Sequence, residues 1–260
     1  MSIGSIDCQP FMSFFEGMVV SVADAQVSVR DAAGDVSTCE LAAVEAGRLA
    51  AGRPWRVFRW RQGQAHYSGW YWSATTGGHV VYESRLELAR LLLADFDRRV
   101  VAIAAQPFLV TGNDGSRRRR HVPDFLLIGS DGLVTVVNVK PSEQLDKPKV
   151  ADALGWAAAT FAGRGWRHEV WSGASPVLLG NVRFLAGYRR GDRVDAQAVA
   201  AIEGGVGGVV RVGAVEAALA DQFPVEVCRP ALLHLVWRGV FRAGLDDEPL
   251  SVATVLERVA

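Results

Sequence analysis

The sequence lacks any apolar run long enough to cross a membrane, although 50% of its 260 residues are hydrophobic. A membrane-spanning helix needs about 18 or more consecutive apolar residues. The first thirty residues also lack the basic start and apolar core of a secretory signal. We therefore expect a cytoplasmic protein with no membrane partner. Its length suits one sizeable core, or a core domain with a smaller domain attached.

Cysteine is scarce, and metal-binding pairs are missing. Cys8, Cys39 and Cys228 are odd in number and far apart, which argues against a disulfide framework and against a paired-cysteine zinc site. The five histidines are equally scattered and form no closely spaced ligand pair. We therefore do not expect a zinc enzyme. These histidines are His66, His79, His121, His168 and His234.

No excess of either charge is present, because Lys+Arg and Asp+Glu both number 28. Any nucleic-acid contact must therefore come from a local basic patch. One candidate is the run from Arg117 to Arg120, just before His121. The other is the stretch 55–61, where arginines alternate with aromatic residues. The alternative for each patch is a solvated basic loop or a half-buried strand.

The first half of the chain predicts a small β-rich segment followed by a long helix. Alternating apolar residues over 17–38, broken at 31–35, indicate a β-hairpin. Residues 68–78 are typical of a loop or an edge strand. Apolar residues at helical spacing then predict a helix over about 82–96. The hairpin lies in an expected N-terminal segment, residues 1–54.

The middle of the chain predicts a mixed α/β layer. Expected strands cover 100–110, with an interruption near Pro107, then 121–128, 133–140 and 167–171; a helix over about 147–161 precedes the last strand. The Asn-Asp-Gly sequence at 113–115 is a strong turn signal. We assign this layer to one domain, residues 55–189.

Residues 190–260 differ in composition, with segments rich in alanine and glycine, and form the third expected domain. Helices near 212–223 and 230–239 precede strands at 240–243 and 251–256. This order gives a winged-helix-like outline. The alternative is a plain helical cap that buries the apolar edge of the preceding sheet.

Four polar residues carry the predicted chemistry: Glu83, Asp124, Asn138 and Lys140. Side chains two apart on a strand share a face, so Asn138 and Lys140 point the same way at the end of an apolar run. Asp124 can reach that face from the neighbouring strand, and Glu83 lies one residue inside the expected helix. Polar groups at the end of a buried run need partners or a function.

These residue types suit hydrolysis of a phosphodiester. A divalent cation polarises the phosphate and activates water, and a positive group offsets the charge that builds on the phosphate oxygens. Carboxylate and carbonyl oxygens suit Mg²⁺, and lysine supplies the positive group. Pro-Asp followed by x-Lys is common by chance, so the motif depends on its context of adjacent strands between two helices.

Three segments occur in an order that resembles the TnsA-like endonuclease subunits of heteromeric transposases. They are 82–84 (Tyr-Glu-Ser), 121–125 (His-Val-Pro-Asp-Phe) and 137–141 (Val-Asn-Val-Lys-Pro). The resemblance extends over roughly residues 55–260 and includes the aromatic segment 66–76. It implies a restriction-endonuclease-like mixed sheet flanked by helices, within the PD-(D/E)xK nuclease superfamily.

The resemblance also implies roles for individual residues. Glu83 and Asp124 would be metal ligands, the backbone carbonyl of Val139 would complete the inner shell, and Lys140 would be the catalytic lysine. Asn138 departs from the acidic residue of the general motif. It would place a neutral amide oxygen on the cation, which is Mg²⁺ with Mn²⁺ as a substitute. The position of Arg117, Arg118, Arg119 and Arg120 just before the strand bearing Asp124, and not the resemblance, places them near DNA; Lys147 and Lys149 are expected surface charges that can touch phosphate.

The partners implied are double-stranded DNA at transposon ends, a DDE-type transposase subunit and an ATP-dependent transposition regulator. Three functions stay open at this point. The first is a transposon endonuclease that hydrolyses one strand at each end. The second is a DNA-binding or assembly subunit whose nuclease centre is weakened at Asn138. The third is a stand-alone restriction or defence nuclease with the same site.

Overall fold

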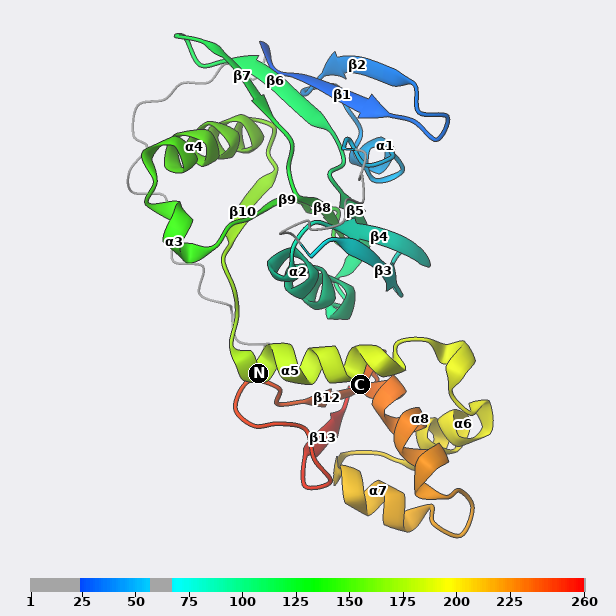
Figure 1. Ribbon diagram of the computed structural model, residues 1–260. Coiled ribbons are helices and arrows are strands. Elements are labelled where there is room, and N and C mark those ends of the chain that lie inside the picture. Colours follow the sequence, from blue (N-terminus) through cyan, green and yellow to red (C-terminus); the bar gives the residue numbers. More distant parts are fainter. Residues whose placement is uncertain (1–23, 57–66, 260) are drawn as a thin grey trace. The chain divides into compact units, whose positions relative to one another are not determined.

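The computed structural model describes residues 24–56 and 67–259, which form a mixed α/β protein with several small sheets (Figure 1). The strands are β1 (Gln26–Arg30), β2 (Val36–Glu40), β3 (Gly69–Ser73), β4 (Gly78–Tyr82), β5 (Val100–Ala105), β6 (Leu109–Asn113), β7 (Arg118–His121), β8 (Phe125–Gly129), β9 (Val134–Val139), β10 (Arg167–Trp171), β11 (Val209–Arg211), β12 (Phe241–Ala243) and β13 (Val255–Arg258). The α-helices are α1 (Ala46–Ala50), α2 (Arg85–Phe96), α3 (Ser142–Leu145), α4 (Pro148–Gly163), α5 (Pro176–Leu185), α6 (Ala196–Gly205), α7 (Val212–Ala218) and α8 (Val225–Trp237). Of the described helices, none has the length and apolar character needed to cross a membrane.

The chain forms two compact units, each assembled from separated segments. Of the described residues, the first unit contains 24–56, 104–126 and 133–170. The second contains 67–103, 127–132 and 171–259. These units divide the chain differently from the three consecutive domains expected from the sequence.

The first unit contains a four-stranded sheet with the order β2-β1-β6-β7. All three pairings are antiparallel. The β1–β2 hairpin confirms the turn predicted at 31–35, where the Asp31 carboxylate accepts hydrogen bonds from the backbone N–H groups of Ala33, Gly34 and Asp35. Because β1 also pairs with β6, this hairpin is an integral part of the sheet and not a separate N-terminal piece.

Helix α4 covers the apolar face of this sheet. Its buried side chains Trp156, Ala157 and Phe161 belong to the same core as Val27 and Val110 of the sheet. Figure 1 shows α4 beside the β6–β7 hairpin. The helix predicted over 147–161 is therefore confirmed with small shifts at its ends.

A second sheet has the strand order β10-β9-β8-β5. Asn138 lies in its strand β9, while Asp124 directly precedes β8 and Lys140 directly follows β9. The single strand predicted over 121–128 is wrong, because the chain forms β7 in one sheet and β8 in the other. Pro123, which has no backbone N–H to give to a ladder, lies between the two strands. Asp124 consequently lies at the start of β8, where the chain passes from one sheet to the other.

The second unit includes the β3–β4 hairpin and helix α2, joined by the buried carboxylate of Asp95. Asp95 accepts hydrogen bonds from the hydroxyls of Tyr71 and Ser73 and from the backbone N–H groups of Ala74 and Thr75. The buried residues of α2 are Ala89, Leu91, Leu92, Ala94 and Asp95. Asp95 thereby anchors the loop that follows β3.

The last part of the second unit has the element order α6, β11, α7, α8, β12, β13, and its sheet has the order β11-β13-β12. Two helices and two strands were predicted here, whereas α5, α6 and β11 were not. Helix α8 begins at Val225, five residues before the expected start at Pro230. Pro230 removes only one helical hydrogen bond, while the apolar residues after it are buried.

Candidate active site around Asp124

The backbone of Asp124 is held by two hydrogen bonds, in addition to the contacts of its side chain. Its N–H donates to the carbonyl of Val137 at 3.0 Å, and its carbonyl accepts from the N–H of Gln106 at 2.9 Å. The residue is only 8% exposed. Strand β9 and the residue that follows β5 therefore hold the backbone of Asp124 at a defined position.

One oxygen of the Asp124 carboxylate collects the polar contacts from the end of β9. Oδ2 accepts a hydrogen bond from the backbone N–H of Val139 at 2.7 Å. It also lies 3.9 Å from Nζ of Lys140 and 3.5 Å from Nδ2 of Asn138. The Lys140 side chain is 35% exposed, so its ammonium group can meet a ligand from solvent. The structure thus brings Asp124, Asn138, Val139 and Lys140 together in the first unit.

The amide oxygen of Asn138 is occupied by two histidines. Asn138 is 1% exposed, and its Oδ1 lies 3.0 Å from Nε2 of His121 and 3.0 Å from Nε2 of His168. Both rings can donate an Nε2–H to this oxygen only in the tautomer that carries the proton on Nε2. Asn138 therefore links β7, β9 and β10, and its oxygen is already used by hydrogen-bond donors.

Burial keeps both histidines neutral. It lowers the pKa of His168 to about 4, with a further lowering by His121 and a partial opposing effect from Glu169. Burial also lowers the pKa of His121, against the opposing effects of the Asn138 hydrogen bond and the Asp124 charge. Neutral rings suit the donor arrangement, because an imidazole with one N–H supplies a single donor to the shared oxygen.

Gln106 supports Asp124 from an unusual backbone conformation. It has φ of 46°, the one positive φ found at a non-glycine position among the described residues, and it is 2% exposed. Its carbonyl accepts a hydrogen bond from the N–H of Trp55 at 2.8 Å. A strained residue that is hydrogen-bonded to Asp124 through its own N–H points to a constrained site.

Glu83 belongs to the second compact unit, and its local structure differs from the expectation. It does not lie inside the helix, because Ser84 is the N-cap of α2 and Glu83 precedes it. The Glu83 N–H donates to the Glu87 carboxylate at 2.7 Å, and the Glu87 N–H donates to the Ser84 hydroxyl at 3.0 Å. This reciprocal capping pattern explains why the helix begins at Arg85.

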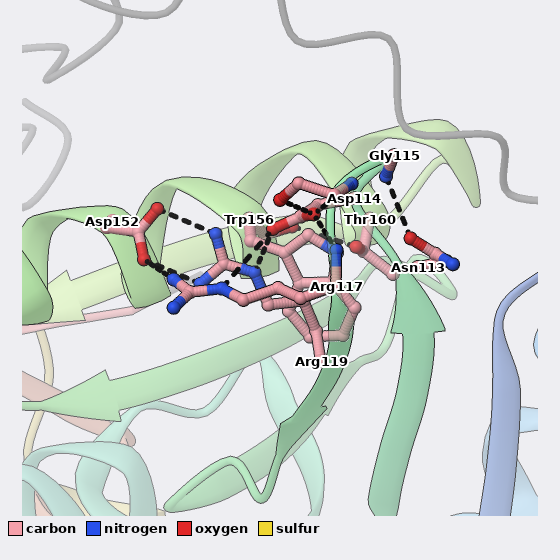
Figure 2. A network of polar contacts seen from close by, with 9 residues as sticks. Asn113, Asp114, Gly115, Arg117, Arg119, Asp152, Trp156 and Thr160 are labelled. Atoms are coloured by element: carbon pink, nitrogen blue, oxygen red, sulfur yellow. Dashed lines mark hydrogen bonds and ion pairs between the residues drawn. The ribbon is translucent and has the colours of Figure 1, made fainter.

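The arginine run is not uniformly available to a ligand. Arg119 forms ion pairs with Asp114 and with Asp152 of α4, and Arg117 also reaches Asp152 at 2.6 Å (Figure 2). Hydrogen bonds from the side chain and backbone of Ser116, and then from the Arg117 backbone, hold the pKa of Asp114 well below its usual range. Two of the four arginines therefore have a structural role.

The other basic residues expected near DNA are exposed where the structure describes them, and part of the second basic stretch lies outside the described residues. Arg118, Arg120, Lys147 and Lys149 are all exposed. In the stretch 55–61, residues 57–61 lie outside the described residues.

No family model matches the chain, and no curated protein sequence is significantly similar to it. Within residues 24–56 and 67–259, no three His, Cys, Asp or Glu side chains converge in a way that could hold a metal ion. A cation at Asp124 would therefore depend on backbone carbonyl, water or phosphate oxygens for its other ligands. Mg²⁺ commonly binds in this way, with one or two carboxylates and several waters or substrate phosphates.

His121, His168 and Gln106 are the site residues that sequence reasoning missed. The histidines were dismissed because they are far apart in sequence, whereas three strands bring their rings onto one amide oxygen. The available signal was that His121 and His168 both fall in expected strands. Gln106 gives no such signal, because its positive φ follows from its place between β5 and β6.

Proposed function

We propose that this protein is a metal-dependent DNA endonuclease whose reaction centre is built on Asp124 and Lys140. The observation that carries the proposal is a buried carboxylate with a partly exposed ammonium group 3.9 Å away, at the end of a sheet strand. A buried carboxylate favours cation binding, and a nearby positive group can stabilise developing negative charge on a phosphate.

The cation would be Mg²⁺, with Mn²⁺ as a substitute, and when bound it would supply phosphate polarisation and water activation. Asp124 and the carbonyl of Val139 would hold it. The sequence pattern alone adds Glu83 as a further ligand. Lys140 contacts a phosphate oxygen in this scheme, and the Val139 N–H keeps the Asp124 carboxylate oriented. The donor set consists of hard oxygens, which fits Mg²⁺ better than a softer metal.

The finer fold description is also a proposal. The sheet β10-β9-β8-β5 with α4 supports a restriction-endonuclease-like arrangement around Asp124. The order α6, β11, α7, α8, β12, β13 and the three-stranded sheet support a winged-helix-like fold for the C-terminal part. Such modules place a helix against DNA or a protein partner.

The proposed substrate is duplex DNA at transposon ends, cut on one strand, and it rests on the resemblance of the three sequence segments. A DDE-type transposase subunit would cut and join the other strand, and an ATP-dependent regulator would control assembly. Residues 190–260 are the proposed contact region for DNA or for these partners.

One observation favours a second candidate, an assembly subunit with a weakened nuclease centre. The Asn138 oxygen accepts from two imidazole N–H groups and is not directed to a cation. A site with a neutral residue at this position also attracts a divalent cation less strongly than one with an acid. In this candidate the protein binds DNA ends and leaves both cuts to its partner.

The test is nicking of supercoiled plasmid and transposon-end DNA in Mg²⁺ or Mn²⁺, by the protein alone and with its partner subunits. We expect Asp124→Ala, Lys140→Ala and Glu83→Ala each to lower the rate by about a hundredfold or more. Unchanged nicking in both the Asp124→Ala and the Lys140→Ala proteins would show that the site is wrong. Nicking that appears only with partners, and is unaffected by Asp124→Ala, supports the assembly subunit.

A further inference from the structure

Strand β7 divides the arginine run into two faces. Arg119 is 13% exposed at its side chain and turns inward to Asp114 and to Asp152 of α4. Figure 2 shows Arg117 and Arg119 directed to the same Asp152 carboxylate. Since side chains alternate along a strand, Arg118 and Arg120 lie on the opposite, outward face.

The two outward arginines carry positive charge that nothing in the described chain neutralises. Both are exposed, and no carboxylate of residues 24–56 or 67–259 forms an ion pair with either one. Their cross-strand neighbours on β6 are Asn113 and Thr111, which are neutral. Because the chain has zero net charge, this local excess is the electrostatic signal that bulk composition hides.

Among the described residues, the part of this sheet face beside the two arginines is polar, whereas positions farther along β1, β2 and β6 carry Arg30, Val36 and Leu109. The inward face holds the buried Val27, Val29 and Val110, so the alternate positions face out. Glu40 is the carboxylate on these outward strand positions; it lies on β2, three strands from β7 or about 14 Å away. The neutral polar residues at outward positions are Gln26, Ser28, Thr38, Thr111 and Asn113.

We propose that Arg118 and Arg120 bind phosphates of duplex DNA that flanks the point of cleavage. This inference rests on the proposed function and specifies which part of the first unit contacts the substrate backbone. Guanidinium groups are strong phosphate partners, and the neutral hydroxyls and amides beside them add further donors. His121, one residue after Arg120, turns inward to Asn138. The outward arginines therefore contact flanking phosphates and do not take part in the chemistry.

Two other roles for these arginines make different predictions. Charged residues on an edge strand such as β7 prevent pairing with other chains, and this role needs no ligand. An acidic protein segment would also be attracted, but it would not require the pair to bind DNA. Both alternatives leave the DNA affinity of an Arg118 and Arg120 variant unchanged.

The experiment measures binding of a fluorescein-labelled DNA duplex of about 30 base pairs, with Ca²⁺ in place of Mg²⁺, over a range of salt concentrations. We expect Arg118→Ala/Arg120→Ala to weaken binding about tenfold or more and to reduce the salt slope by about two, as expected for two lost phosphate contacts. Arg118→Lys/Arg120→Lys should keep most of the slope. Arg117→Ala is the matched control, because it removes one charge from the same run but an inward-directed one.

Arg118→Glu/Arg120→Glu keeps charge on the edge strand and should also lose DNA binding, so aggregation of the alanine variant does not hide the result. Unchanged affinity and slope in the folded alanine and glutamate double variants, or no duplex binding by the wild type, would overturn the inference. Variant-sensitive DNA binding without nicking by any protein leaves the inference standing and rejects the proposed nuclease.

Discussion

At the scale of single residues, Asn138 connects the two histidines to the Asp124 carboxylate. Its oxygen satisfies two buried imidazole N–H groups, and its Nδ2 faces the Asp124 carboxylate. An acid at this position would add charge to the cation site, but it would also face two imidazoles whose pKa values are lowered by burial. The amide therefore fits a neutral histidine pair.

Two replacements of Asn138 should distinguish the contribution of its hydrogen bonds to stability from the contribution of its side-chain shape. Asn138→Ala leaves the Nε2–H groups of His121 and His168 without their acceptor, and we expect a loss of about 2–4 kcal/mol in the free energy of unfolding. Asn138→Asp keeps an acceptor for both rings but replaces the Nδ2 donor with a second oxygen that faces Asp124, so it should also lose stability. Urea denaturation of the three proteins checks this, and an alanine variant as stable as the wild type would contradict the hydrogen bonds.

The lowered pKa of His168 predicts an acid-dependent stability. Its pKa changes from the ordinary 6.5 to about 4 on folding. The unfolded chain therefore takes up the proton first as the pH falls. The free energy of unfolding should be unaffected above about pH 6.5 and should fall by up to about 3 kcal/mol towards pH 4. His121 adds a change of the same sign.

The measurement is urea denaturation at several pH values in EDTA, for the wild type and for His168→Gln. Glutamine retains an N–H donor but does not titrate, so its stability should depend less on pH over this range. An equal pH dependence in both proteins would show that His168 is not neutral in the folded state.

At the scale of elements, the contact between the β6–β7 hairpin and α4 depends on Arg119. Arg119→Ala removes the less exposed of the two arginines that pair with Asp114 and Asp152, and leaves Arg117 as their partner. We expect a loss of about 1–3 kcal/mol, below that of a fully buried pair because the Asp152 side chain is 40% exposed. Arg118→Ala is the control and should change stability by less than about 0.5 kcal/mol. Thermal unfolding compares them, and equal effects would contradict the division into two faces.

The same elements show what the sequence could and could not predict. Helices α2 and α4 and strands β9 and β10 were predicted close to their observed bounds, because their apolar periodicity is regular. The division of 121–128 into β7 and β8 was missed, since both halves are apolar or β-prone and only sheet pairing separates them. Leu133, at the expected start of the strand over 133–140, is 44% exposed, and the strand begins one residue later.

Only part of the candidate site could be predicted, because only some of its residues are related by a pattern within the sequence. Asp124, Asn138 and Lys140 could be grouped because they lie on strands whose spacing and order are readable from the chain. The histidine contacts to Asn138 depend on three strands from two sheets meeting, which no local pattern contains. The pairing of Arg119 with Asp152 is likewise a contact between residues 33 positions apart.

At the scale of the whole molecule, the expected boundary at residue 190 passes through a packed structure. Asn181 of α5 donates to the carbonyls of Leu245 and Glu248 and accepts from the N–H of Leu250. The carbonyl of Tyr188 is 2.7 Å from Nδ1 of His234. These contacts place α5 with the C-terminal elements.

A fragment of residues 174–260 should therefore unfold more cooperatively and at a higher temperature than a fragment of residues 190–260. Loss of the Asn181 hydrogen bonds alone removes about 2–4 kcal/mol. Circular dichroism melting of the two fragments, with Asn181→Ala in the longer one as a control, checks this expectation. Equal melting temperatures would place the boundary where the sequence suggested.

The proposed nuclease requires a catalytic cation at Asp124. The most direct measurement is a crystal structure of the protein soaked in Mn²⁺, with the ion located by its anomalous scattering. We predict an ion at about 2.1 Å from an Asp124 carboxylate oxygen, with the Val139 carbonyl as a second ligand and the Asn138 oxygen still held by its histidines. Absence of an ion from Asp124 at saturating Mn²⁺ would contradict the account.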